Sequence, residues 1–513
     1  MRATLIVVLV GCAAAPAPPP AAPPPVVEHH PAPAPPVERI ASPATAAVVA
    51  KLDDPREAER AIDELVQLGD PDAIPGLGAA WITQGKPVRI LAAIIALAKP
   101  RAWDRAMPFM IRALADIDPN NPRSVDSAAQ AAEAMGEARL PGAIDALIGL
   151  SRQPVSKTAI IAEVSAIRAL GHFAADKPKV AAALVAIIER ELPPHPKPTN
   201  DAAREEPFAL ALASAGAAIN ALAELRTTVG IDALVLAMYR MPELFTQIQR
   251  ALVASGPAAE TVLVHVLRGD HAAVNALFKA KSLDRYCDPG GSACEPVSAK
   301  DFYPAAVLGD FHDDAIVPDL MQALERKPAP VYFYDDQPSP NTQHTAIFDA
   351  LRKLGSTSSA ASVRARWIDP KVDVQTRILA VATYPFVVRD AADVDQLGAI
   401  AADNTADDNL RQEAATAFAR LARSPKDISL LQKLAKRYLD ASTTKAKEAV
   451  RFKSEADTAD REFEAQRAIH DKARDVAGKT ADQIRAATVK ADADFRVAKR
   501  AHSDRVSRFK NLD

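Results

Sequence analysis

Residues 58–81 read AERAIDELVQLGDPDAIPGLGAAW, and this stretch decides the fold class. Gly69 is typical of a helix end, and Asp70 followed by Pro71 is typical of the cap and first turn of a new helix. Apolar residues recur at helical spacing on both sides of this turn. They are Ala61, Leu65 and Leu68 before the turn and Ile74, Leu77 and Trp81 after it. The stretch therefore predicts two helices joined by a tight turn.

The same pattern recurs along the chain. Further copies are centred on Gly136, Gly171, Leu225, Gly256, Gly309 and Gly355, and weaker copies on Lys99-Pro100, Pro385 and Ser424. The result is about ten units between residues 44 and 425, with centres roughly 30 to 55 residues apart. One helical pair cannot bury its apolar stripe alone, so neighbouring pairs are expected to stack into a continuous core.

The composition favours the same class. Hydrophobic residues make up 49% of the 513 residues and charged residues 25%, which suffices for a folded core, while aromatic residues make up only 5%. Abundant alanine and leucine with few aromatics favour closely packed helices over sandwiches and barrels. A net charge of −3 provides no general attraction to nucleic acid or to an anionic membrane. We therefore predict an all-α protein whose electrostatic partners, if any, bind a local patch.

This repeated pattern resembles HEAT repeats, in particular the short subclass shared with phycobilisome-lyase-like proteins. The resemblance covers most of residues 44–425. It implies a HEAT-type α-solenoid, a superhelix of antiparallel helix pairs with an extended concave face. The repeated residues are those that stack helices, so the resemblance says much about fold and little about function.

The start of the chain carries a targeting pattern. Arg2 precedes an apolar run over residues 5–10, and Gly11 and Cys12 follow. The pattern resembles a bacterial lipoprotein signal, which implies cleavage before Cys12 and lipidation of that cysteine. An ordinary cleaved signal that uses the alanines at 13–15 and a cytosolic terminus are the alternatives. We expect a lipid-anchored protein of the bacterial cell envelope, at the outer membrane or the periplasmic face.

Residues 13–43, which follow the predicted signal of residues 1–12, are almost entirely proline, alanine and valine. Such a composition cannot bury a core and favours extended polyproline segments, so this part is predicted to be a disordered tether. In the sequence beyond it, no stretch suggests the ~20 apolar residues of a membrane-spanning helix. The predicted membrane contact is therefore the lipid alone.

Cys287 and Cys294 flank the residues DPGGSA, whose turn formers ease a chain reversal. In an oxidising compartment the two thiols are expected to form a disulfide, worth about 2 to 3 kcal/mol on the chain-entropy model. A metal site or a pair of free thiols is the alternative. No further ligand accompanies the pair at the close spacing that a metal site needs.

Three inserted segments are predicted to share one edge of the solenoid: residues 118–123, 192–206 and 327–343. The last contains a cluster of aromatic and acidic residues among prolines, which form a candidate partner-binding loop: Tyr332, Phe333, Tyr334, Asp335 and Asp336. Exposed rings beside carboxylates suit a peptide, a glycan or a basic partner. Alternatively, the rings fold back and seal adjacent repeats.

Residues 426–513 differ from the body in charge and pattern. They contain 21 basic and 15 acidic residues, a net charge of +6, which leaves −9 for the rest. Apolar residues follow helical spacing on both sides of Gly478, which predicts a hairpin of two long helices. A single helix or a coiled coil with another subunit is the alternative. The basic face suits the acidic body or an anionic surface, or no dedicated ligand, and nucleic acid is not expected for an exported protein.

Catalytic motifs are not found in the sequence. The 10 histidines are scattered, and His172, His265 and His312 are interpreted as packed or surface residues. Three acidic pairs begin at Asp53, Asp313 and Asp407, each at a predicted helix start or turn where aspartate caps free amides. We therefore expect no enzymatic activity, no cofactor and no metal ion.

The sequence as a whole predicts a non-enzymatic, protein-binding scaffold that uses the concave face and the inserted loops of the solenoid. The protein partner is not identified by any motif, and oligomerisation through the C-terminal helices is a further possibility. One alternative is a lipoprotein that binds a glycan or a small molecule. The other, implied by the resemblance to lyase-type repeats, is a lyase-like or chromophore-handling protein.

Overall fold

The computed structural model describes residues 42–99, 101–153, 156–193, 202–280, 297–327, 330–332, 338–388 and 393–473, together with 497 and 499. Within these residues the regular secondary structure is helical apart from one short pair of strands, so the predicted all-helical class is confirmed. The strands β1 (Pro330–Tyr332) and β2 (Pro338–Thr342) pair antiparallel, with Pro330 opposite Thr342 and Tyr332 opposite Pro338. This ribbon was not predicted. It lies within the inserted segment whose prolines exclude a regular helix.

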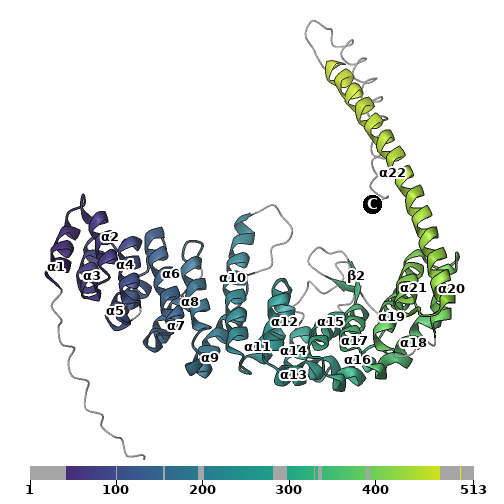
Figure 1. Ribbon diagram of the computed structural model, residues 1–513, viewed down its shortest axis with the longest axis horizontal. Coiled ribbons are helices and arrows are strands. Elements are labelled where there is room, and N and C mark those ends of the chain that lie inside the picture. Colours follow the sequence, from purple (N-terminus) through teal and green to yellow (C-terminus); the bar gives the residue numbers. More distant parts are fainter. Residues whose placement is uncertain are drawn as a thin grey trace, which may run out of the picture.

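The helices form two layers (Figure 1). The first layer contains α1 (Pro43–Val49), α2 (Ala58–Leu68), α4 (Val88–Ala98), α6 (Pro122–Glu137), α8 (Ile160–Leu170), α10 (Ala202–Leu225), α12 (Phe245–Ala254), α15 (Val297–Leu308), α17 (Gln343–Leu354), α19 (Val374–Val387) and α21 (Asp408–Leu421). The second layer contains α3 (Ile74–Thr83), α5 (Trp103–Ala115), α7 (Ile144–Ser151), α9 (Lys177–Ile188), α11 (Ile231–Arg240), α13 (Pro257–Arg268), α14 (Ala272–Lys279), α16 (Val317–Ala323), α18 (Ala360–Ile368) and α20 (Val394–Ala402). The last helix is α22 (Pro425–Ala473).

The two layers, which we call the array, form a curved row with the first layer on the inside of the curve (Figure 1). Within the described residues, the extensive contacts join elements that are close in the sequence: α6 packs on α8, α8 on α10 and α19 on α21. One contiguous apolar core runs through the array from Val48 to Leu434. The array is therefore built by local packing that is repeated from one helix pair to the next.

The turn between α2 and α3 shows how the sequence produces this geometry. Gly69 ends α2 in the left-handed conformation, with φ of 63°, which glycine adopts without steric cost. The Asp70 carboxylate accepts a hydrogen bond from the Asp72 backbone N–H at 3.0 Å and so caps the next turn. Trp81 is fully buried, but Leu68 is 47% exposed, so the prediction that Leu68 lies on the packed face is wrong. Its side chain belongs to the last turn of α2, which its neighbours do not cover.

Gly136 has a different role from the predicted one. The pattern placed it at a turn, but it lies within the last turn of α6, and the chain leaves the helix only at Ala138. A Cβ atom at Gly136 would lie 2.7 Å from the Cα atom of Ala169 on α8. Gly309 stands in the same relation to Ala350 on α17, also at 2.7 Å. These glycines allow neighbouring first-layer helices to approach closely.

α10 is the longest helix of the array. Its residues Glu206–Leu225 form the one described stretch that is long and apolar enough to cross a membrane, which corrects the expectation that none exists beyond the signal. More than half of that stretch is buried in the fold, where α10 packs on α8, α9 and α12. We interpret it as a core helix of the first layer. α10 and the β1–β2 ribbon project toward the same side of the array (Figure 1). The common edge of the three inserted segments stays a prediction, because much of the second and third segments lies outside the described residues.

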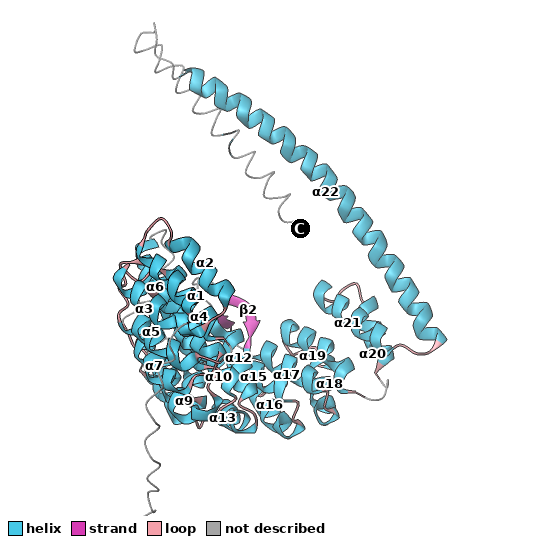
Figure 2. Cartoon of the chain, turned by 60° about the vertical axis from the view of Figure 1, so that its left-hand side comes forward, coloured by secondary structure: helices cyan, strands magenta, loops and turns pink. Residues whose placement is uncertain are grey.

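α22 leaves the array as a single continuous helix of 49 residues (Figures 1 and 2). Its first three turns pack on α20 and α21, with Leu434 only 4% exposed. Farther along, Leu439 and Val450 are 67% and 71% exposed. We call residues 439–473 the arm. The predicted turn at Gly478 lies outside the described residues, as does all of the predicted second helix except residues 497 and 499, which are helical.

Candidate functional site

Most of the site residues predicted from the sequence lie outside the described part of the chain. These are Cys12, Cys287 and Cys294, together with Phe333, Tyr334, Asp335 and Asp336. Tyr332 is the last residue of β1, so the aromatic and acidic cluster belongs to the connection between the two strands. The lipidation, the disulfide and the binding role of this loop stay predictions. The predicted tether also lies outside the described residues, except for its last two: Ser42 caps α1, the first described helix, which begins at Pro43.

The described structure instead shows a recurring polar arrangement at the ends of second-layer helices. Arg190, Arg240 and Arg326 each follow or end such a helix, and each donates a hydrogen bond to a carbonyl at the end of an earlier second-layer helix. Arg240 Nη2 donates to Arg190 O at 2.7 Å, and Arg326 Nη2 donates to Leu267 O at 2.8 Å. Arg190 donates in the same way to Ser151 O.

The last carbonyls of a helix have no partner within it and carry partial negative charge. We call these three residues the end-bridging arginines. Each one satisfies such a carbonyl and so fixes the register of two adjacent helix pairs.

Two of the end-bridging arginines also hold a buried carboxylate. Arg190 Nη1 lies 2.8 Å from Glu163 Oε1 on α8, and Arg326 pairs with Asp301 on α15. Glu163 and Asp301 are only 4% and 2% exposed. Burial raises the pKa of both carboxyls, and the arginines offset only part of this effect. The two clusters are equivalent in the array, which indicates a structural device used twice and not a single catalytic centre.

His344 on α17 belongs to the same seam of helix ends. Its Nε2 donates to Arg326 O at 2.8 Å, and its Nδ1 lies 3.3 Å from the Thr376 hydroxyl. Gln343 beside it donates to Lys327 O at 2.8 Å. Burial lowers the pKa of His344, so the ring is neutral at pH 7 and acts as a structural donor. No motif in the sequence predicted a role for these residues. The available signal was a lone charged or polar residue within an otherwise apolar helix, as in IIAEVSAI around Glu163.

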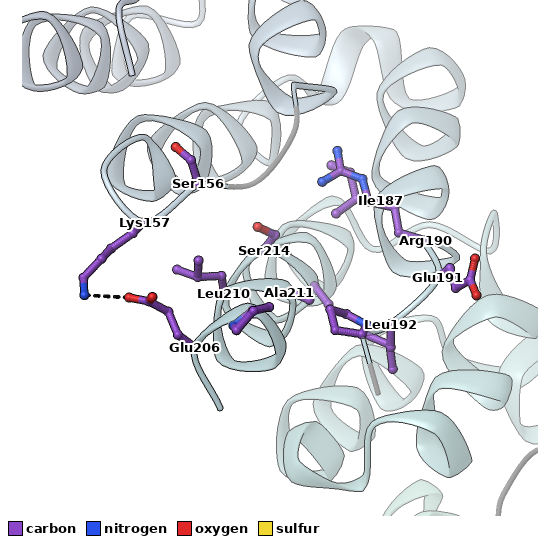
Figure 3. Close-up of a pocket in the computed structure, with 13 residues that line it drawn as sticks. Ser156, Lys157, Ile187, Arg190, Glu191, Leu192, Glu206, Leu210, Ala211 and Ser214 are labelled. Carbon is purple, nitrogen blue, oxygen red and sulfur yellow. Dashed lines mark ion pairs between the residues drawn. The ribbon is translucent and has the colours of Figure 1, made fainter. Parts of the chain in front are cut away.

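A cavity of about 280 Å3 opens between the start of α8, the end of α9 and the side of α10 (Figure 3). Its wall is mainly apolar, formed by Ile187, Leu192, Leu210 and Ala211 among others. The hydroxyl-bearing Ser214 is 1% exposed at this wall.

The charged groups around the cavity are largely paired. At its edge, Lys157 Nζ lies 2.7 Å from Glu206 Oε1. The Arg190 guanidinium is already bonded to Glu163 and Ser151. The cavity therefore offers apolar contact and a few polar groups, a combination typical of small-ligand sites.

The acidic pairs have the capping role that the sequence predicted. Asp313 accepts a hydrogen bond from the Ala315 N–H at 2.8 Å, and Asp407 accepts from the Asn409 and Leu410 N–H groups at 2.9 and 3.1 Å. In the first pair, Asp54 accepts from the Arg56 N–H at 2.9 Å. No group of three or more His, Cys, Asp or Glu side chains suited to a metal ion occurs among the described residues.

Neither a model of a known protein family nor a curated protein matches this chain. Membership of the HEAT family therefore stays a prediction from the repeated sequence pattern.

Proposed function

We propose that this protein is a non-enzymatic, protein-binding scaffold of the bacterial cell envelope. The observation that carries the proposal is the long inner face of the array. This face is formed by first-layer helices from α2 to α21 and faces the inside of a curve (Figure 1). An extended concave surface of this kind accommodates a protein partner over many side chains. The insertions at α10 and at the β1–β2 ribbon rise from the array and enlarge the surface.

We further propose that the array is a HEAT-type α-solenoid. Support comes from the positions of the predicted turns: Gly69, Gly171, Gly256 and Gly355 each follow the last turn of a first-layer helix. It also comes from packing that joins each helix mainly to its neighbours in the sequence. These features are expected of a repeat architecture, in which each unit buries the apolar stripe of the next. The arm adds a long exposed helix through which two copies would form a coiled coil.

The compartment follows from the predicted lipid anchor at Cys12. In cells, the unchanged chain is expected to fractionate with membranes and to incorporate a labelled fatty acid. A Cys12→Ala variant is expected to lose the label and to enter the soluble fraction. A labelled Cys12→Ala chain would contradict the anchor at this residue, and unlabelled chains of both kinds would contradict lipidation altogether.

A photo-crosslinking side chain introduced on each face of the array tests the scaffold function. Ala96 on α4 and Thr246 on α12 are exposed on the inner face, whereas Ala79 on α3 and Ala182 on α9 are exposed on the outer layer. Irradiation of intact cells is expected to give the same discrete protein adduct from both inner positions and from neither outer position. Adducts from all four positions, or from none, would contradict a scaffold that binds through its inner face.

A second candidate function is a lipoprotein that binds a glycan or another small molecule. The cavity between α8, α9 and α10 favours it, because its size and mostly apolar wall suit a small ligand. Native mass spectrometry of the protein purified from its own envelope distinguishes the two functions. A defined small mass that is released on unfolding, and that an Ala211→Trp variant lacks, would support the second function.

A further inference from the structure

A groove of about 680 Å3 opens in the first layer between α12 and α17. Its lining comes from four elements and consists of Arg226, Thr246, Gln249, Arg250, Val253, Ala254, Asp310 and Lys353. Arg226 follows the end of α10, and Arg250 lies on α12. Gln249 spans the floor: its Nε2 donates to Ala306 O at 3.3 Å and to Asp310 Oδ2 at 2.5 Å. The groove is therefore part of the inner face that the proposed scaffold uses.

The groove carries more positive than negative charge. Three of its lining residues are cationic and one is acidic. Both carboxylate oxygens of Asp310 are already engaged, Oδ1 with Lys353 Nζ at 2.8 Å and Oδ2 with Gln249. Arg226 and Arg250 are exposed and form no described ion pair, and Arg250 Nη2 donates a long hydrogen bond to Asn220 Oδ1 at 3.5 Å. Two guanidinium groups thus face the groove with hydrogen-bond donors available to a ligand.

Basic residues continue along the inner face beyond the groove. Arg352 precedes Lys353 on α17, and its guanidinium lies 5.8 Å from the centre of the Phe386 ring on α19. The Arg420 guanidinium on α21 lies 4.8 Å from the same centre. Stacking on an aromatic ring orients a guanidinium. The Arg352 guanidinium also pairs with Asp349, whereas Arg420 has no described ion pair. The groove and this cluster together make a line of basic groups on α12, α17 and α21.

We propose that this line, with the groove at one end, binds an extended acidic segment of the protein partner. Carboxylate side chains accept paired hydrogen bonds from arginine, and a line of separated cations matches a chain more readily than a compact anion. The inference rests on the proposed scaffold function and names the chemistry of the partner. The chain's own tail, with a net charge of +6, is excluded as the occupant by like charge.

The probe is a fluorescein-labelled octaglutamate peptide, whose like charges keep it extended. Fluorescence anisotropy with the full-length protein is expected to show binding that weakens strongly as salt is raised from about 50 to 300 mM, because screening acts on exposed pairs. Arg226→Glu/Arg250→Glu is expected to weaken binding about tenfold or more. Arg226 has a φ of 47°, so its replacement strains the backbone. Arg250→Glu alone avoids this strain and is expected to weaken binding several-fold.

The matched control is Arg60→Glu/Arg123→Glu. Both arginines are exposed, lie outside the groove and form no described ion pair, and the double variant has the same net charge as the groove variant. It is expected to bind octaglutamate as the unchanged protein does. Equal weakening by the two double variants would overturn the proposal, because net charge alone would then explain binding. Binding of an octalysine peptide as tight as that of octaglutamate would also overturn it.

A labelled single-stranded oligonucleotide of eight nucleotides serves as the competing polyanion. If the oligonucleotide binds more tightly than octaglutamate, and if the groove variant no longer binds it, the groove binds nucleic acid and the proposed peptide class is wrong. The scaffold function is judged separately by the inner-face adducts. If those adducts persist in the groove variant, the scaffold stands and the groove inference fails. If octaglutamate binds as expected but no adduct forms, the groove stands and the scaffold function fails.

Discussion

The array and the arm differ in what surrounds their helices. In the array, side chains from neighbouring pairs cover each helix, and large residues such as Trp81 and Trp367 are fully buried. In the arm, Leu439 and Val450 are mostly exposed, and the described polar contacts are largely local, such as Arg461 Nε to Asp457 O at 3.2 Å. Both regions are rich in alanine and charged residues. The same residue types therefore form helices in both regions, but only the array helices depend on packing with residues from other helices.

A substitution in the core of the array is expected to give the largest effect. Trp367 is fully buried and packs edge-on against Tyr384, with ring centres 5.3 Å apart. Trp367→Ala is expected to lower the free energy of unfolding of the array by about 3 to 5 kcal/mol. Val450→Ala in the arm is expected to change it by less than about 0.5 kcal/mol. Urea denaturation followed by circular dichroism measures both, and similar costs would break the distinction between array and arm.

The next effect concerns the buried carboxylates that arginine holds. Arg326→Met leaves Asp301 buried without its cation and is expected to cost about 2 to 4 kcal/mol. Lys426→Met removes one partner of an exposed pair with Asp395, 2.9 Å apart, and is expected to cost less than about 1 kcal/mol. Chemical denaturation measures the free energy of unfolding of both variants. The double variant Arg326→Met/Asp301→Asn should recover part of the loss, and no recovery would refute the pairing as the cause.

Close helix contact gives a smaller effect. In Gly136→Ala the new methyl group meets the α8 backbone at Ala169, so the array is expected to lose about 1 to 3 kcal/mol. Gly149 on α7 has no atom within 4 Å of a new Cβ atom, so Gly149→Ala is expected to gain up to about 1 kcal/mol through helix propensity. Thermal unfolding of the two variants shows whether each substitution stabilises or destabilises the array. Stabilisation by Gly136→Ala would show that the first-layer helices do not touch as described.

The smallest effect is a dependence of stability on pH. Burial raises the pKa of Glu163, so the folded chain holds this proton more tightly than the unfolded chain. Its contribution is therefore complete below the ordinary value of 4.5 and is lost as the pH rises through the raised folded pKa. Glu163→Gln is expected to flatten the stability profile in this range, whereas Glu464→Gln in the exposed arm is not. Denaturation midpoints measured from about pH 4 to 8 test this, and parallel profiles would contradict it.

The sequence predicted the helical class and most of the turns, because both depend on local signals. A helical apolar period with a glycine or Asp-Pro at its end is visible within a few residues, as at Gly69. The sequence-based predictions failed where contact with a neighbouring helix decides whether a residue is buried. Leu68 follows the apolar period but is left uncovered, and Gly136 serves a contact with α8 that no local pattern reveals.

The candidate site was predictable only in part. The acidic pairs were identified as caps because aspartate bonds to amides two or three residues away, as Asp407 does. The end-bridging arginines and the basic groove were missed. Arg326 bonds to a carbonyl 59 residues earlier, and the groove assembles Arg226, Arg250 and Lys353 from three separate parts of the chain. Such neighbours have no fixed spacing in the chain.

A series of amphipathic helix pairs follows from the sequence alone, because helix period, caps and turns act over a few residues. The assembled fold is needed to show which charges are buried and paired and which are left facing the inner groove. That choice depends on how the layers stack, which brings Glu163 to Arg190 from 27 residues away and leaves Arg226 and Arg250 open. Burial and charge pairing are properties of the assembled fold, since they arise between groups that the chain separates.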